Sequence, residues 1–216
     1  MTLSLNEIEA QAKRAARGAG LSWGMAEEAG RAARWLASHD LPGSAHLADV
    51  LAMNDGLPQS DVAPVSLEGD WHAAAGALCP LAAGSALNDC ADRLGRGEPV
   101  TMTDISCPLL VLPFAAWAAI HLGAPVQIGW ESLQIVTDGD GIRITDPENR
   151  INAARAATLT CRMAGQPLEA ATLPRLRGEV PAAVWDRLDT FAQRTFAPAT
   201  EASRLLGAGT GGSDND

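Results

Sequence analysis

The sequence predicts an α+β protein with a small mixed or antiparallel sheet, an N-terminal helix pair and a long C-terminal helix. Apolar residues recur at helical spacing in the first part of the chain and again after Pro181. Between these parts, short apolar or alternating runs are separated by turns rich in Gly, Pro and Asp, as is typical of strands. The 216 residues fit one domain, 1–216. We divide it into an N-terminal helical segment (1–55), a sheet region (99–165), C-terminal helices (180–207) and a Gly/Asp tail (208–216).

The first two helices have recognisable starts. Ser4 and Glu7 have the spacing of a capping box, in which each side chain binds the other residue's backbone amide. Ser22 is a good N-cap for the second helix, which the breaker residues 40–43 end. Because both helices are rich in alanine, we expect them to pack closely as an antiparallel pair. A third, short helix is expected over 44–53.

The middle of the chain changes character. We expect a connector over 56–70 and a helix over 85–94. Asp138-Gly139-Asp140-Gly141 predicts a hairpin, because Asp-Gly supplies the positive-φ positions of a tight turn. Strands are expected at 99–105, 126–130, 133–137, 141–145 and 156–163, and a helix at 113–122 with proline in its first turn.

The last part of the chain predicts a loop and two helices. The loop spans 167–178, and Pro181 opens the long helix. Pro198 fits poorly inside a helix, so this helix should kink or stop near Phe196. A shorter helix is expected over 200–206, ended by Gly207.

Composition excludes some partners. The net charge of −10 repels nucleic acid and anionic membrane surfaces. No secretion signal opens the chain, and its longest apolar run, 107–122, is shorter than the roughly 20 residues of a membrane span, so we expect a cytoplasmic protein. The dispersed cysteines predict reduced, mostly buried thiols, although their role is left open: Cys79, Cys90, Cys107 and Cys161.

The C-terminal run carries the densest polar chemistry. Arg194 and Arg204 are suited to clamp a carboxylate or a phosphate bidentately, with Glu201 beside them. Thr200 as an N-cap would direct helix amides to the same place, near Ser203. The alternative is an internal Arg–Glu network followed by a frayed polar tail.

A second candidate group lies in the turn before the second helix. Ser22, Trp23 and Glu27 could line a pocket there, or Trp23 could simply staple two helices together. Ser85, Asn88 and Asp89 form a weaker polar group, with solvent-facing side chains as the simpler explanation. The histidines show no metal-binding spacing, so no metal site is predicted, and nothing in the sequence indicates that Cys107 meets His121.

The chain resembles a proteobacterial family known only as a domain of unknown function. The resemblance is carried by the opening Leu-Ser-Leu-Asn-Glu-Ile-Glu-Ala, by residues 16–29 and by Arg-Thr-Phe-Ala-Pro-Ala-Thr-Glu-Ala-Ser-Arg near the end, and extends over nearly the whole chain. It implies a soluble bacterial protein and no particular mechanism. Residues 3–50 are also similar in pattern to the start of type-2 malate/lactate dehydrogenases, with Leu47 where that family has a glycine after its histidine.

Two functional hypotheses follow. In the first, the protein binds or converts a small acidic metabolite between the N-terminal turn and the C-terminal run. Arginines hold the carboxylate, and Glu201 or Glu27 acts as acid or base. In the second, it is a non-catalytic accessory protein whose Ala-rich helices and Gly-rich tail form an interface with a partner or a second copy. The sequence names no cofactor and does not decide whether the protein is an enzyme.

Overall fold

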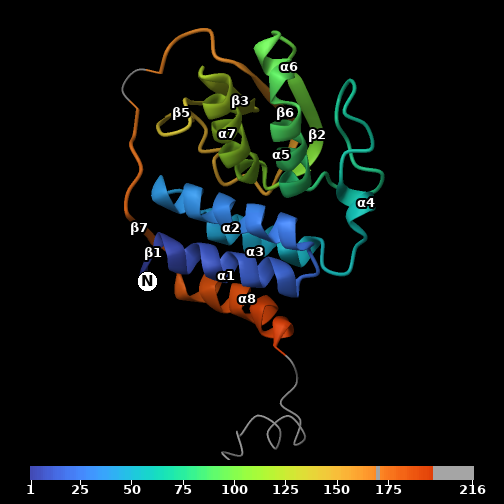
Figure 1. Ribbon diagram of the computed structural model, residues 1–216, viewed down its shortest axis with the longest axis vertical. Helices are drawn as coiled ribbons and strands as arrows, with labels where there is room; N and C mark the ends of the chain where they lie inside the picture. Colours follow the sequence, from blue (N-terminus) through green and yellow to red (C-terminus); the bar gives the residue numbers. More distant parts are fainter. Residues whose placement is uncertain (169–170, 197–216) are drawn as a thin grey trace, which may run out of the picture.

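The computed structural model describes residues 1–168 and 171–196 (Figure 1). It mixes helices with antiparallel sheets, which confirms the predicted α+β class. The helices are α1 (Leu5–Gly18), α2 (Trp23–Ser38), α3 (Gly43–Met53), α4 (Gln59–Val62), α5 (Pro80–Asp89), α6 (Ala91–Gly95), η1 (Pro108–Val111), α7 (Leu112–Leu122), α8 (Ala182–Ala192) and η2 (Gln193–Thr195). The strands are β1 (Thr2–Ser4), β2 (Val100–Ser106), β3 (Val126–Trp130), β4 (Leu133–Thr137), β5 (Ile142–Thr145), β6 (Arg155–Met163) and β7 (Arg177–Glu179).

The predicted helix starts are confirmed. The amide of Glu7 donates to Oγ of Ser4 at 3.2 Å, and the amide of Ser4 donates to the Glu7 carboxylate at 2.8 Å, which completes the capping box. The amide of Met25 donates to Oγ of Ser22 at 3.3 Å. Both caps satisfy helix amides that have no intrahelical partner, so each start is determined locally.

The helices α1, α2, α3 and α8 pack together in a bundle, which we call the helical layer. Figure 1 shows α8, α1 and α2 one above the other, with α3 overlapping α2 in this view, and α3 contacts the other three helices. The alanines between α1 and α2 are fully buried, and their small side chains let the backbones approach: Ala12, Ala15, Ala16, Ala26, Ala29, Ala32 and Ala33. At the contact of α1 with α8, a Cβ on Gly18 would lie 1.8 Å from the carbonyl oxygen of Phe191, so this crossing requires glycine.

The main sheet has the strand order β2-β6-β3-β4-β5. β6 follows β5 in the chain but lies between β2 and β3, antiparallel to both. Figure 1 shows α5 and α7 against this sheet, and both helices contact its strands. The predicted hairpin over 138–141 is present between β4 and β5.

Two side chains at the end of α2 join the helical layer to this hairpin. Nε1 of Trp35 donates to the carbonyl oxygen of Gly139 at 3.1 Å. Nε2 of His39 lies 2.9 Å from the carbonyl oxygen of Asp140, and its ring stacks at 4.0 Å on the ring of Trp35. The β4–β5 turn is therefore held by α2 as well as by its own strands.

Several predicted boundaries were wrong. The helix expected over 85–94 begins at Pro80 and is interrupted at Cys90, giving α5 and α6. The connector over 56–70 contains the short helix α4, and the loop over 167–178 ends in β7, which pairs with β1. Three-residue strands show no clear alternation, so sequence pattern did not reveal this pair.

The long C-terminal helix stops early, as predicted. Regular helix ends at Ala192, and η2 continues to Thr195. The predicted helix over 200–206 and the tail over 208–216 lie outside the described residues. Within 1–168 and 171–196, no helix is both long enough and apolar enough to cross a membrane.

Candidate metal centre

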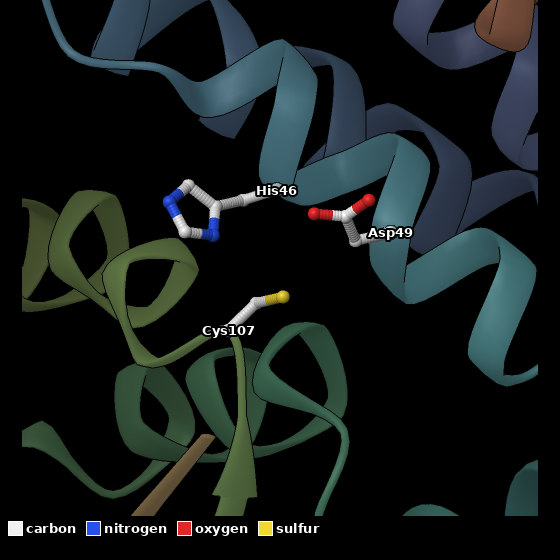
Figure 2. A group of neighbouring side chains, drawn as sticks. All are labelled: His46, Asp49 and Cys107. Carbon is white, nitrogen blue, oxygen red and sulfur yellow. The ribbon is translucent and has the colours of Figure 1, made fainter. Parts of the chain in front are cut away.

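Three potential metal ligands meet where the helical layer touches the end of β2. His46 and Asp49 lie on α3, three residues apart and therefore on the same side of the helix. Cys107 follows β2 directly. One ligand atom from each residue lies within 4.8 Å of the other two. Figure 2 shows the imidazole, the carboxylate and the thiol pointing toward one common space.

The backbone at Cys107 is held in an unusual conformation. Its φ of 39° and ψ of 61° are left-handed, a region that non-glycine residues seldom adopt. The amide of Cys107 donates to the carbonyl oxygen of Ala154 at 2.9 Å, and its own carbonyl accepts from the amide of Leu110 at 3.0 Å. Such strain costs on the order of 1–3 kcal/mol and is concentrated at functional sites. The conformation turns the chain from β2 into η1 and presents the thiol to α3.

His46 carries the strongest sign of a missing partner. Its side chain is buried, with 5 % of the residue's surface exposed. Nδ1 has no hydrogen-bond partner among the described residues. A buried polar atom without a partner costs about 1–3 kcal/mol, and such atoms in folded proteins call for an explanation. A metal ion bound at Nδ1 would supply one.

The electrostatics of the centre favour neutral groups. Burial, followed by the nearby Asp49 and Cys79, raises the pKa of the Cys107 thiol to about 12. Burial lowers the pKa of His46, against smaller opposite effects of Asp49 and Asn152. The imidazole is therefore in the neutral form that binds metals. The thiol has no positive charge to stabilise its thiolate, so the arrangement does not favour a free cysteine nucleophile.

Asp49 lies on the side of the centre that faces solvent. Its side chain is 45 % exposed, and its Oδ1 accepts a hydrogen bond from Nη2 of Arg187 at 2.6 Å. Arg187 lies on α8, so this ion pair links α8 to α3. Because the guanidinium contacts one carboxylate oxygen, the other oxygen remains for a further ligand. Arg187 can therefore orient Asp49 in the manner of the outer partners that orient metal ligands.

Three of the eight predicted site residues have polar partners within the chain: Arg194, Ser22 and Glu27. Nη1 and Nη2 of Arg194 donate to the two oxygens of Asp55 at 2.7 and 3.0 Å. Arg194 therefore forms a bidentate pair with a carboxylate of this protein, and the predicted clamp with Arg204 on a ligand stays a prediction. Ser22 is engaged as a helix cap, and Glu27 forms an ion pair with Lys13 at 2.6 Å.

Trp23 does not lie in a buried site. It is 65 % exposed, and the guanidinium of Arg17 lies 4.4 Å from its ring centre. This contact links α2 to α1 and is closer to the predicted staple than to a pocket wall. The remaining predicted site residues lie outside the described part of the chain: Thr200, Glu201, Ser203 and Arg204.

The other sequence candidates are separated from the centre. Nε2 of His121 lies 3.2 Å from Oδ1 of Asp92, and the two form an ion pair when the imidazole is protonated. His121 is thus paired with Asp92 and does not belong to the cluster with Cys107. Ser85 and Asp89 line a mainly apolar pocket of about 390 Å³ that also contains Cys79. The cysteines are unpaired; Cys90 is partly exposed, and the other three are buried as predicted.

Sequence reasoning missed this cluster because it looked for paired histidines and for a Cys107–His121 pair, and did not combine His46 with Asp49. The His46-x-x-Asp49 spacing is a local signal that the two side chains share a helix face. A second signal is Cys107 between a strand and Pro108, a position where a turn is expected. That these two signals belong together follows only from the packing of α3 against η1.

Comparison with known proteins identifies part of the chain. Residues 3–79 match the family described as "Protein of unknown function (DUF3726)". The match includes residues 16–29 of the resemblance described above and ends before the closing motif. It contains His46 and Asp49 but not Cys107. Searches of curated proteins and of solved structures gave no match. Residues 3–79 are thus similar to a domain family of unknown function, and the site has to be interpreted from its geometry.

Proposed function

We propose that this protein binds a divalent transition-metal ion, with zinc the best fit, through His46, Asp49 and Cys107. The observation that carries the proposal is the buried, unpartnered Nδ1 of His46 beside a carboxylate and a thiol. Thiolate, imidazole and carboxylate together are the ligand types that Zn²⁺ uses in proteins. Ca²⁺ and Mg²⁺ prefer oxygen ligands and suit the set less well.

The ligand separations are compatible with zinc after a small contraction. Zinc bonds of about 2.0–2.3 Å in tetrahedral geometry place ligand atoms about 3.3–3.8 Å apart. The present atoms lie within 4.8 Å of one another, so binding requires a closure of about 1 Å. Asp49 is partly exposed and can make most of this movement, whereas His46 and Cys107 are held in the core.

Three protein ligands leave one tetrahedral position open. Zinc sites with an open position activate water or polarise a carbonyl, whereas closed sites with four protein ligands are structural. This favours a site that acts on a small molecule. The acidic metabolite predicted from the sequence remains a separate proposal.

Two other functions are supported less well. A cysteine nucleophile assisted by His46 would use the same residues, but the high pKa of the buried Cys107 thiol opposes it. The accessory-protein hypothesis also remains a proposal. Because the alanines between α1 and α2 are buried in the core, a partner of the described part of the chain would have to bind other surfaces.

The decisive experiment is cobalt substitution of the purified protein. Co²⁺ reports its ligands directly, because thiolate coordination gives a charge-transfer band in the near ultraviolet and tetrahedral geometry gives intense visible bands. We expect one equivalent of Co²⁺ with both signatures, displaced by one equivalent of Zn²⁺. At a zinc concentration 100 times its dissociation constant, the protein should gain about 2.7 kcal/mol of stability.

The matched control is Cys161→Ala, since Cys161 is also fully buried but outside the centre. Cys161→Ala should keep the metal stoichiometry and the thiolate band. Cys107→Ala should abolish the band, and His46→Ala should lower the affinity at least tenfold. Absence of metal binding, or a thiolate band that persists in Cys107→Ala, would refute the proposal.

A further inference from the structure

A second candidate site lies on the side of the main sheet that carries polar side chains. Directly paired residues in antiparallel strands face the same side of a sheet. The register places Arg162 of β6, Gln127 of β3, Val136 of β4 and Arg143 of β5 in one row across the sheet. The next row contains Thr160, Gly129, Gln134 and Thr145.

This surface is hollowed between its two arginines. A depression of about 380 Å³ is lined by both arginines, both glutamines, Val136 and Thr145, together with residues 163–166. Its volume lies in the range of pockets for small ligands. None of the described residues that line it carries a carboxylate.

The two arginines are exceptional among those that the structure describes. Every other described arginine makes a side-chain hydrogen bond or ion pair with another part of the chain. The side chains of Arg143 and Arg162 make no hydrogen bond and no ion pair with residues 1–168 or 171–196. In a chain with a net charge of −10, acidic partners are plentiful, so two guanidiniums over one hollow that have no partner among the described residues point to an external anion.

We propose that this depression, the Arg143–Arg162 hollow, binds a small dicarboxylic acid. Neighbouring strands lie about 4.8 Å apart, so three strand spacings separate the two arginine backbones by about 14 Å. Each guanidinium can hold one carboxylate through two parallel hydrogen bonds. Gln127 and Gln134 offer amide donors between them, and Val136 provides an apolar floor for the carbon chain.

This site is independent of the metal proposal. It uses no residue of the candidate metal centre, and its charge comes from arginine alone. It assigns the acidic ligand predicted from the sequence to Arg143 and Arg162 in place of Arg194 and Arg204. It also differs from a nucleic-acid surface, because the overall acidity of the chain opposes a polyanion and none of the described lining residues is aromatic.

The test is isothermal titration of the full chain with succinate, glutarate and adipate, with EDTA present throughout. Propionate is titrated as the monocarboxylate probe. Inorganic phosphate and a short oligonucleotide are titrated to compare other kinds of anion. We expect one dicarboxylate to bind at least tenfold more tightly than propionate and phosphate. Arg143→Gln and Arg162→Gln should each weaken it about tenfold, and the double variant should abolish measurable binding.

The matched control is Arg155→Gln, also on β6, whose side chain is paired with Asp104. It should leave the affinity unchanged, as should His46→Ala. Each variant is checked by circular dichroism for an unchanged fold. Equal binding of mono- and dicarboxylates, preference for the oligonucleotide, or no binding at all would overturn the proposal. Dicarboxylate binding that appears only with zinc and disappears in His46→Ala would place the acid at the metal centre and would overturn it as well.

Discussion

The imidazole of His46 and the thiol of Cys107 face one another across the junction between α3 and the end of β2, with their ligand atoms within 4.8 Å. The charged group beside both is Asp49, which favours the protonated imidazole and opposes the thiolate. The imidazole nitrogen Nδ1 is unpartnered, and the thiol is kept protonated by burial. A metal ion bound between them would give Nδ1 a partner and would stabilise the thiolate. The proposed metal binding therefore accounts for this pair better than acid–base or nucleophilic chemistry.

Arg187 should tune metal affinity through Asp49. Arg187→Gln removes the ion pair that orients the Asp49 carboxylate, and loss of such an outer partner typically weakens metal binding 10–100-fold. We expect a loss of about tenfold in zinc affinity, measured by competition with a chromogenic chelator. Arg194→Gln is the matched control, because it breaks a similar exposed pair with Asp55 outside the centre. Equal losses in the two variants would show that the effect is not transmitted through Asp49.

Gly18 and Gly24 should respond in opposite ways to the same substitution. Alanine is favoured over glycine within a helix by about 0.5–1 kcal/mol. Gly24 has nothing within 4 Å of a new Cβ, so Gly24→Ala should stabilise the protein by up to that amount. At Gly18 the Cβ would meet the backbone of Phe191 at 1.8 Å, which α8 can accommodate only by moving. Urea unfolding should therefore show Gly18→Ala less stable than wild type by about 1–3 kcal/mol; a stabilised Gly18→Ala would disprove the close crossing of α1 and α8.

Gly84 tests the packing of α5 against α7. A Cβ at this position would lie 2.3 Å from the ring of Phe114, which is itself fully buried. Gly84→Ala should destabilise the fold by about 1–3 kcal/mol because a dense core has no room for the methyl group. The double variant Gly84→Ala/Phe114→Leu should recover part of this loss by making space. No recovery would indicate that the strain lies in the backbone instead of the ring.

Trp35 should hold the β4–β5 turn in place. Trp35→Phe keeps an aromatic ring beside His39 but removes the hydrogen bond to the carbonyl of Gly139. A net hydrogen bond contributes about 0.5–1.5 kcal/mol, which is the expected loss in the free energy of unfolding. Hydrogen exchange should also become faster at Gly139 and Asp140 than at β2. A uniform change over the whole sheet would contradict a local anchoring role.

Acid should weaken the Asp55–Arg194 pair. The Arg194 guanidinium lowers the pKa of the Asp55 carboxyl below its ordinary value. A lowered folded-state pKa contributes stability that is present above the unfolded value of about 3.9 and is lost as the pH falls below it. Asp55→Asn should therefore lower Tm slightly at pH 7, and the difference from wild type should shrink as the pH falls through the lowered pKa of Asp55. The pair is exposed, so high salt should reduce the effect at pH 7; a difference that grows with acid would contradict this sign.

Much of the fold could be predicted because its signals are local. The caps at Ser4 and Ser22 and the Asp138–Gly141 hairpin each depend on residues within a few positions of one another. The β1–β7 pair could not be predicted in this way. It joins residues 2–4 to residues 177–179, far apart in sequence, and both strands are too short to show an alternation of apolar and polar residues. The break at Cys90 was missed because α5 and α6 have similar composition, and no proline or glycine separates them.

The candidate sites were predicted less well than the fold. Arg194 was predicted to clamp an external ligand together with Arg204, whereas in the structure it binds Asp55, because a spacing in sequence cannot say which carboxylate an arginine will reach. Arg143 and Arg162 drew no attention because they are ordinary exposed strand residues in the sequence. Their common row exists only because β6 is inserted between β2 and β3.

The sequence alone determined the class of fold, the helix starts and the tight turn, because these depend on backbone preferences and hydrogen bonds between near neighbours. The tertiary structure decided which distant polar groups come together: His46 lies near Cys107, Arg194 binds Asp55, and Arg143 and Arg162 line one depression on the same sheet face. These contacts depend on helix packing and strand order. Both follow from burial of the whole apolar core, a property that no single stretch of the chain contains.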